Sequence, residues 1–218
     1  MINLRVKLFA QALALGVTLA ACSGGSEVDE RPLESFTPEE LYKRAEFELE
    51  QERDAEEAAR IFGEVERLYP YSEWSKRALI MQAFSYHRDQ DYEASRSSSQ
   101  RFLDTYPADE DAPYAQYLLA LSYYDQIDQV GREQGLTFQA LQSLREVIER
   151  YPDSDYARSA ILKFDLAFNH LAAKEMEIGR YYLKRGHYVA AINRFRVVVE
   201  DFQTTDQTPE AVHRLVEA

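Results

Sequence analysis

The sequence predicts an all-α protein, built as a solenoid of stacked antiparallel helix pairs. From residue 38 onward Gly and Pro are sparse, and the apolar residues recur at helical rather than strand-like spacing. Four segments also share one frame of mostly apolar positions, at offsets 0, 3, 4, 7, 10, 11 and 14, which indicates an internal repeat. A closed helical bundle whose heptad-like spacing imitates repeats is the alternative. The framed segments are residues 55–69, 92–106, 137–151 and 188–202.

Each framed segment ends in an aromatic residue, and in the first three a proline follows at once. Because proline lacks the amide proton and clashes with the preceding turn, Pro70, Pro107 and Pro152 predict three helix ends. A second helix precedes each framed segment. The pairs resemble the tetratricopeptide repeat, in which a small residue such as Gly179 lets two helices approach and an aromatic such as Phe195 fills the gap.

Three departures from a uniform repeat are visible. The third pair carries an insertion between its helices, within residues 125–135, and the fourth pair begins with a long helix over roughly residues 154–184. In the second pair, polar residues stand where Ala and Leu are expected, so this helix should bury less apolar area. These polar residues are Ser95, Arg96, Ser98 and Ser99.

The amino terminus is typical of an export signal. Arg5 and Lys7 form a short basic region, and residues 8–21 follow without a charge, a run too short to span a bilayer core of roughly 30 Å. The run ends in Leu-Ala-Ala before Cys22, which resembles the lipobox of bacterial lipoproteins. That resemblance implies cleavage after residue 21 and a diacylglycerol and an N-acyl chain on Cys22, and Ser23 after it implies the outer membrane. An ordinary signal peptide with an incidental cysteine is the alternative.

The predicted organisation is therefore a signal peptide at 1–21, a lipidated flexible tether at 22–37 and a helical solenoid at 38–218. The tether is rich in Gly and acidic residues and would hold the folded body away from the bilayer. The solenoid holds four repeats and the start of a fifth.

Composition excludes several function classes. The 218 residues carry a formal net charge of −13, which becomes −15 once Arg5 and Lys7 leave with the signal. Such an acidic surface repels phosphate backbones and anionic headgroups, so we expect neither nucleic-acid binding nor electrostatic membrane adhesion. With one cysteine, the chain has no intramolecular disulfide and no four-cysteine metal site.

The sequence also offers no catalytic constellation. The four histidines are scattered without metal-ligand spacing, and there is no glycine-rich phosphate loop or nucleophile elbow. Acid pairs such as Glu39-Glu40 are most simply solvated helix faces. We therefore expect a binding protein without cofactors other than the covalent lipid on Cys22, and no enzyme.

A candidate groove for a client polypeptide follows from the repeat frame, because the first helix of each tetratricopeptide pair lines the concave face. Aromatic side chains there give a large apolar contact with few rotors to immobilise, and Arg88 could hold a carbonyl or carboxylate. The alternative is that several of these residues belong to the core between helices, since a register error of one residue exchanges the two classes. The predicted groove residues are Phe47, Phe84, His87, Arg88, Tyr117, Leu121 and Tyr124.

The order of these features resembles the BamD family, the lipoprotein subunits of the outer-membrane β-barrel assembly machinery. The most specific match is Tyr-Tyr-x-x-Arg-Gly at residues 181–186 followed by Asn193-Arg194. The resemblance implies a scaffold of five repeats on the periplasmic face of the outer membrane. Its carboxy-terminal half would dock, through Arg194 and neighbouring Asn193, on the barrel-inserting subunit BamA and join other Bam lipoproteins.

The same resemblance implies that the amino-terminal repeats receive unfolded outer-membrane β-barrel proteins. It also leads us to expect a longer natural chain, because the sequence stops at Ala218, inside the first helix of the fifth repeat. The alternative function is that of another outer-membrane repeat lipoprotein, such as a pilus-secretin pilotin or a cell-wall coordinator. A lipoprotein hydrolase is a third possibility, but the sequence lacks the catalytic residues that such an enzyme would need.

Overall fold

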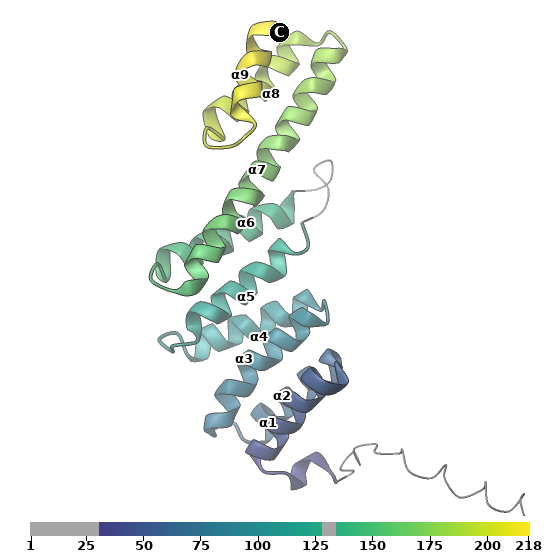
Figure 1. Cartoon of the computed structure of the whole chain (residues 1–218), viewed down its shortest axis with the longest axis vertical. Coiled ribbons are helices and arrows are strands. Elements are labelled where there is room, and N and C mark those ends of the chain that lie inside the picture. The colour runs from purple at the N-terminus through teal and green to yellow at the C-terminus, as the bar shows by residue number, and fades with distance from the viewer. Residues whose placement is uncertain (1–30, 128–133) are drawn as a thin grey trace, which may run out of the picture. The chain divides into compact units, whose positions relative to one another are not determined.

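The structure is a computed structural model that describes residues 31–127 and 134–218. The chain divides into two compact units, residues 1–35 and residues 36–218. The predicted signal peptide and Cys22 lie outside the described residues. In the first unit, the described part holds a short 3-10 helix, η1, at Leu33–Ser35. The second unit contains the helical repeats (Figure 1).

Within the described residues, the second unit consists of helices joined by short connections, without a strand. Each helix packs on the next along the chain, and α1, α3, α5 and α7 also contact one another in sequence, as expected for stacked helix pairs. The all-α solenoid prediction is confirmed. The helices are α1 Pro38–Phe47, with the π-helical turn η2 Glu48–Glu52 after it, α2 Ala55–Leu68, α3 Glu73–Arg88, α4 Tyr92–Thr105, α5 Ala112–Tyr124, α6 Gly135–Arg150, α7 Asp155–Lys184, α8 Tyr188–Asp201 and α9 Thr208–Glu217.

The four framed segments are the helices α2, α4, α6 and α8. Each closing aromatic is the C-cap of its helix, and its backbone N–H donates to the carbonyl oxygen four residues earlier. The first three caps have nearly the same backbone, with φ/ψ of −133°/55° at Tyr69, −129°/55° at Tyr106 and −131°/52° at Tyr151. The proline that follows each of these residues therefore ends the helix as predicted.

Short polar side chains start several of the helices. Asp54 and Asp91 accept the amide hydrogens of Glu57 and Ala94 before α2 and α4, and Ser154 caps α7 in the same way. Such caps pair amide groups that have no partner inside the helix. Polar caps thus mark the starts of these helices, as the aromatic C-caps mark the ends of the framed ones.

The close approach of α7 and α8 depends on Gly179. A Cβ atom at this position would lie 2.4 Å from Cε1 of Phe195, whose side chain is completely buried. No other residue type fits there without moving the ring, so the predicted small-residue and aromatic pairing of the repeat is confirmed at this helix pair.

The polar residues of α4 turn inward and bond to the neighbouring helices. Ser95 Oγ donates to the Ala83 carbonyl oxygen at 2.9 Å and receives a hydrogen bond from Ser122 Oγ at 3.0 Å. Arg96 Nη1 donates to the Ser122 carbonyl oxygen at 3.2 Å. Because these groups satisfy one another across α3, α4 and α5, this interior can be polar without leaving most of its groups unpaired.

Candidate partner-binding surfaces

The long helix α7 changes its packing partners halfway along. Ala160, Ala167 and Leu171 belong to clusters with α5 and α6, whereas Ala172 and Met176 belong to a cluster with α8 and α9. Figure 1 shows the same change, with α6 beside one part of α7 and α8 beside the other. The helix is 30 residues long, so neither neighbour covers its whole length.

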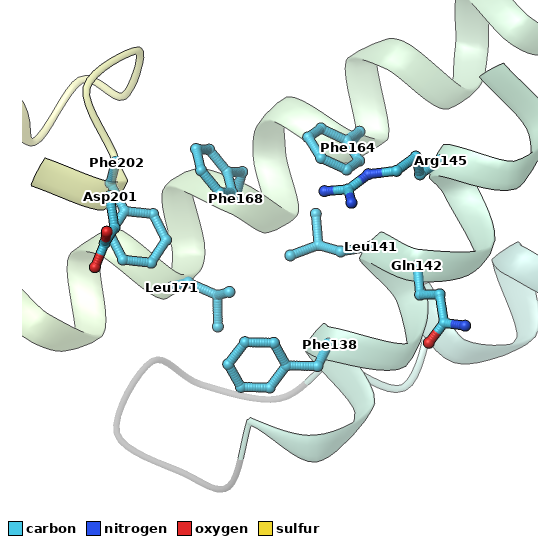
Figure 2. A pocket seen from close by; sticks show the side chains of 9 residues that line it. All are labelled: Phe138, Leu141, Gln142, Arg145, Phe164, Phe168, Leu171, Asp201 and Phe202. Carbon is cyan, nitrogen blue, oxygen red and sulfur yellow. The ribbon is translucent and has the colours of Figure 1, made fainter. Parts of the chain in front are cut away.

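A cavity of about 490 Å³ lies where the partners of α7 change. Figure 2 shows that its side chains come from α6, from α7 and from the end of α8. We call it the α6–α7–α8 cavity. Its lining residues are Phe138, Leu141, Gln142, Arg145, Phe164, Phe168, Leu171, Asp201 and Phe202.

Aromatic contacts connect the walls of this cavity. The rings of Phe164 and Phe168 are stacked with centroids 5.9 Å apart, and Phe168 meets Phe202 at 4.8 Å. The guanidinium carbon of Arg145 lies 5.6 Å from the centroid of the Phe164 ring. Phe138 on the opposite side is 61% exposed, so the cavity is open to solvent through an apolar rim. The sequence frame did not predict this site, because it forms between repeats and not within one.

A second surface covers the corner between α7 and α8. Gly186 has φ of +76°, a left-handed conformation that glycine adopts without strain, and it turns the chain from one helix to the other. Tyr188 and Val189 follow it and are 54% and 75% exposed. They line a shallow depression together with Asn193, which is also exposed. We call this surface the α7–α8 corner.

The predicted partner-binding arginine is held within the chain. Arg194 Nη1 donates to Glu175 Oε2 at 2.9 Å, which joins α8 to α7, and the side chains of Arg194 and Glu175 are 43% and 21% exposed. A partner carboxylate can reach Arg194 only beside Glu175 or in its place. Asn193 thus lies at the α7–α8 corner, and the next residue, Arg194, is paired with Glu175. The role of both residues in partner binding stays a prediction.

The predicted groove residues fall into two groups. Phe47 is 39% exposed and Arg88 is also exposed, whereas the others are half-buried. Phe84 packs against the core of α3, α4 and α5, as Tyr117 and Tyr124 do against the core of α5, α6 and α7. Burial raises the pKa of the Tyr117 and Tyr124 phenols.

Two close approaches involve side chains of the half-buried group. His87 Nε2 lies 3.0 Å from Asp125 Oδ2, and the Lys163 ammonium lies 4.5 Å from the Tyr124 ring centroid. Leu121 is half-buried as well. Much of the predicted groove set therefore contributes to packing between helices, the alternative that the sequence left open, and client contact stays a prediction for all of these residues.

Two further features bear on membranes and metals. None of the helices in the described part of the chain combines the length and the apolar character that a bilayer crossing requires. Among the described residues, no three His, Cys, Asp or Glu side chains gather in a way that could hold a metal ion.

Comparison with known proteins gives consistent matches over nearly the whole sequence. A family model described as "Outer membrane lipoprotein", YfiO, matches residues 34–218. The chain is 42% identical to the outer membrane protein assembly factor BamD of Caulobacter vibrioides, over 95% of this chain and 68% of that protein. It is 37% identical to the protein of the same name from Rickettsia prowazekii, over 97% and 83% of the two chains. The corresponding protein of Neisseria gonorrhoeae is 26% identical, over 92% and 79%.

Proposed function

The chain belongs to the YfiO family of outer-membrane lipoproteins, which includes the assembly factors named BamD, and from this premise we propose that it is a scaffold subunit of the machinery that assembles outer-membrane proteins. The observation that carries the proposal is the 42% identity to such a factor over 95% of the chain. The relatives are named as assembly factors and not as enzymes. None of the relatives named above is a pilotin or a cell-wall coordinator.

The fold suits a scaffold, because a solenoid presents several separate surfaces on one chain of packed helices. The α7–α8 corner is the proposed docking surface for BamA. Its exposed Tyr188 and Val189 supply apolar contact area, and Tyr is a residue type that often dominates binding energy at interfaces.

Arg194 would act at the edge of this contact. Its guanidinium is already oriented by Glu175, so a partner carboxylate that bonds to the free side of the fork meets a group with little freedom left to lose. Arginine presents five N–H donors in a planar fork and can bond to two carboxylates at once. The intramolecular ion pair is therefore compatible with a positioning role in docking.

The placement on the membrane follows from the amino terminus. We propose that Cys22 carries the lipid, that the lipid anchors the chain in the outer membrane, and that the solenoid faces the periplasm. Three acyl chains, each worth about 0.8 kcal/mol per buried methylene, give an anchor that does not exchange on the time scale of assembly.

We further propose that the first three repeats receive unfolded barrel proteins. Phe47 and Arg88, the exposed members of the predicted groove set, are the residues positioned to contact an extended client. The half-buried tyrosines would support these contacts from beneath.

Co-purification from detergent-solubilised envelopes tests the docking proposal. We expect the tagged full chain to retain a BamA-sized barrel protein, and Arg194→Glu to reduce the retained amount by about tenfold, because a like charge then faces the partner carboxylate. Arg196→Glu is the matched control, since Arg196 is an exposed arginine of the same helix. Circular dichroism checks that both variants keep their helices.

Three outcomes would contradict this proposal. One is equal retention by the wild-type chain and the Arg194→Glu variant, which would remove the assignment of that residue. Another is retention of a secretin or of peptidoglycan-binding proteins instead of a barrel protein. Firm membrane retention of Cys22→Ala after signal cleavage would contradict the lipid anchor.

A further inference from the structure

The α6–α7–α8 cavity has an apolar floor with a charged residue at each end. Phe164, Phe168 and Phe202 form the floor, and their rings already contact one another, so the cavity is preformed. Its volume of about 490 Å³ lies within the range of about 300–1,000 Å³ that is usual for ligand pockets. None of the predicted groove residues, and neither Asn193 nor Arg194, lines it.

Arg145 marks one end of the cavity with an uncommitted positive charge. Among the described residues, no carboxylate lies within ion-pair distance of its guanidinium, whose ordered contact is with the Phe164 ring. Figure 2 shows the guanidinium reaching past that ring into the cavity. Several other arginines of the chain are paired with a glutamate, including Arg60, Arg101 and Arg180.

Asp201 marks the other end, next to Phe202 and away from Arg145 (Figure 2). Within the described part of the chain its carboxylate has no cationic partner within 4.0 Å, and its side chain is exposed. The cavity thus offers a cation, a row of aromatic rings and an anion, in that order.

We propose that the α6–α7–α8 cavity binds an extended polypeptide segment with one aromatic side chain between an acidic and a basic residue. The aromatic side chain would fill the floor, where it could meet the rings already there in offset-stacked or edge-to-face geometry. The acidic residue would pair with Arg145 and the basic residue with Asp201. The proposal rests on the proposed function only in that a scaffold of this family has polypeptide partners.

The two charges decide between a polypeptide and other apolar ligands. A fatty acyl chain with an anionic headgroup could use Arg145, but it would leave Asp201 beside an apolar chain. A polypeptide supplies both signs, and in an extended segment residues two apart point to the same side. An acidic residue, an aromatic residue and a basic residue at alternate positions therefore face the cavity together.

A defined peptide tests the proposal directly. The probe is a fluorescein-labelled peptide, Gly-Glu-Ser-Phe-Ser-Lys-Gly with blocked ends, titrated against the full chain in lipid nanodiscs and followed by fluorescence anisotropy. We expect replacement of the probe's Phe by Ala, or of its Glu and Lys together by Gln, to weaken binding by about tenfold each. Dodecanoate should compete weakly.

Charge reversal on the protein sharpens the test. Arg145→Glu should weaken binding of the probe by about tenfold, and a probe with Lys in place of Glu should bind this variant better than it binds the wild-type chain. Arg150→Glu is the matched control, because Arg150 is an exposed arginine of the same helix whose guanidinium stacks on Tyr151 instead. Phe138→Ala removes an exposed rim residue and should also weaken binding.

The proposal would be overturned by equal binding of the charged and the Gln-substituted probes, or by Arg145→Glu behaving like Arg150→Glu. Stronger binding of dodecanoate than of the probe would assign the cavity to acyl chains and would also overturn the proposal. Dimerisation of the chain through this face, with exclusion of the probe, would overturn it as well. The peptide assay does not involve BamA. A failed co-purification would therefore count against docking at the α7–α8 corner without affecting the result for the cavity.

Discussion

The same position of the repeat frame is occupied by Phe195 in α8 and by Ser99 in α4, and both side chains are completely buried. In α8 the ring fills the space left by Gly179 and belongs to a buried apolar cluster with Met176 and Val198. In α4 the serine lies among Ser95, Ser98 and Gln82, which bond to other helices. The same frame position thus holds an aromatic ring in one pair and a serine beside hydrogen-bonded polar groups in the other, although α3, α4 and α5 also share an apolar core.

The two interiors distribute their stability differently. Burial of apolar area contributes in proportion to the atoms removed from water, whereas a hydrogen bond contributes about 0.5–1.5 kcal/mol net and costs more when one partner is removed. We therefore expect the α7–α8 interior to be sensitive to lost volume and the α3–α4–α5 interior to be sensitive to lost partners.

Phe195→Ala should have the largest effect. The ring is fully buried and Gly179 offers no side chain to refill the space, so the free energy of unfolding should fall by about 3–5 kcal/mol. Urea denaturation followed by circular dichroism measures it. A loss below about 1 kcal/mol would show that the helices collapse into the gap and that volume does not hold this interior.

Ser122→Ala and Ser99→Ala sharpen the other side of the comparison. Ser122 Oγ donates to Ser95 Oγ, so its removal should lower the free energy of unfolding by about 1–2 kcal/mol. Ser99 Oγ is buried without a hydrogen-bond partner among the described residues, so its removal should be neutral or stabilising. The two variants lose the same atom, and equal losses in the same denaturation experiment would contradict a hydrogen-bonded interior.

Tyr114 should give the smallest effect, and only in alkali. Burial raises its pKa to about 12 from 10.0, and its ring lies 5.1 Å from that of Tyr156. Because the folded pKa is above the unfolded one, the resulting stability is complete below pH 10 and is lost as the pH rises from 10 towards 12. Denaturation midpoints at pH 9 and pH 11 should therefore differ more in the wild-type chain than in Tyr114→Phe, and an equal shift in both would count against burial of this phenol.

Much of the fold could be predicted because short-range sequence patterns mark the helices of the repeat. The Tyr-Pro stops at Tyr69, Tyr106 and Tyr151 give the ends of three helices through backbone chemistry alone. The serines of α4 could not be interpreted from sequence, since their partners Ala83 and Ser122 lie on other helices. Hydrogen bonds between polar groups on different helices leave no short-range pattern in the sequence.

The partner-binding role of the predicted site residues stays a prediction, because a helical frame gives less information about a site than about the fold. A helical frame states which face a residue occupies but not how far a neighbouring helix covers it, so Tyr117 and Tyr124 were placed in a groove and are half-buried between helices. The α6–α7–α8 cavity escaped prediction for the opposite reason. It exists because α7 extends beyond the end of α6 and packs on α8 only along its second half. This arrangement depends on three helices together.

Depletion of the chain in living cells is the strongest test of its role in outer-membrane protein assembly. The measurement is the fraction of a β-barrel protein in the outer membrane that has reached its heat-modifiable folded form on gels. We expect this fraction to fall as the chain is depleted and to recover when the wild-type chain is supplied. An unchanged folded fraction, with loss of pilus-secretin assembly or of envelope integrity alone, would contradict it.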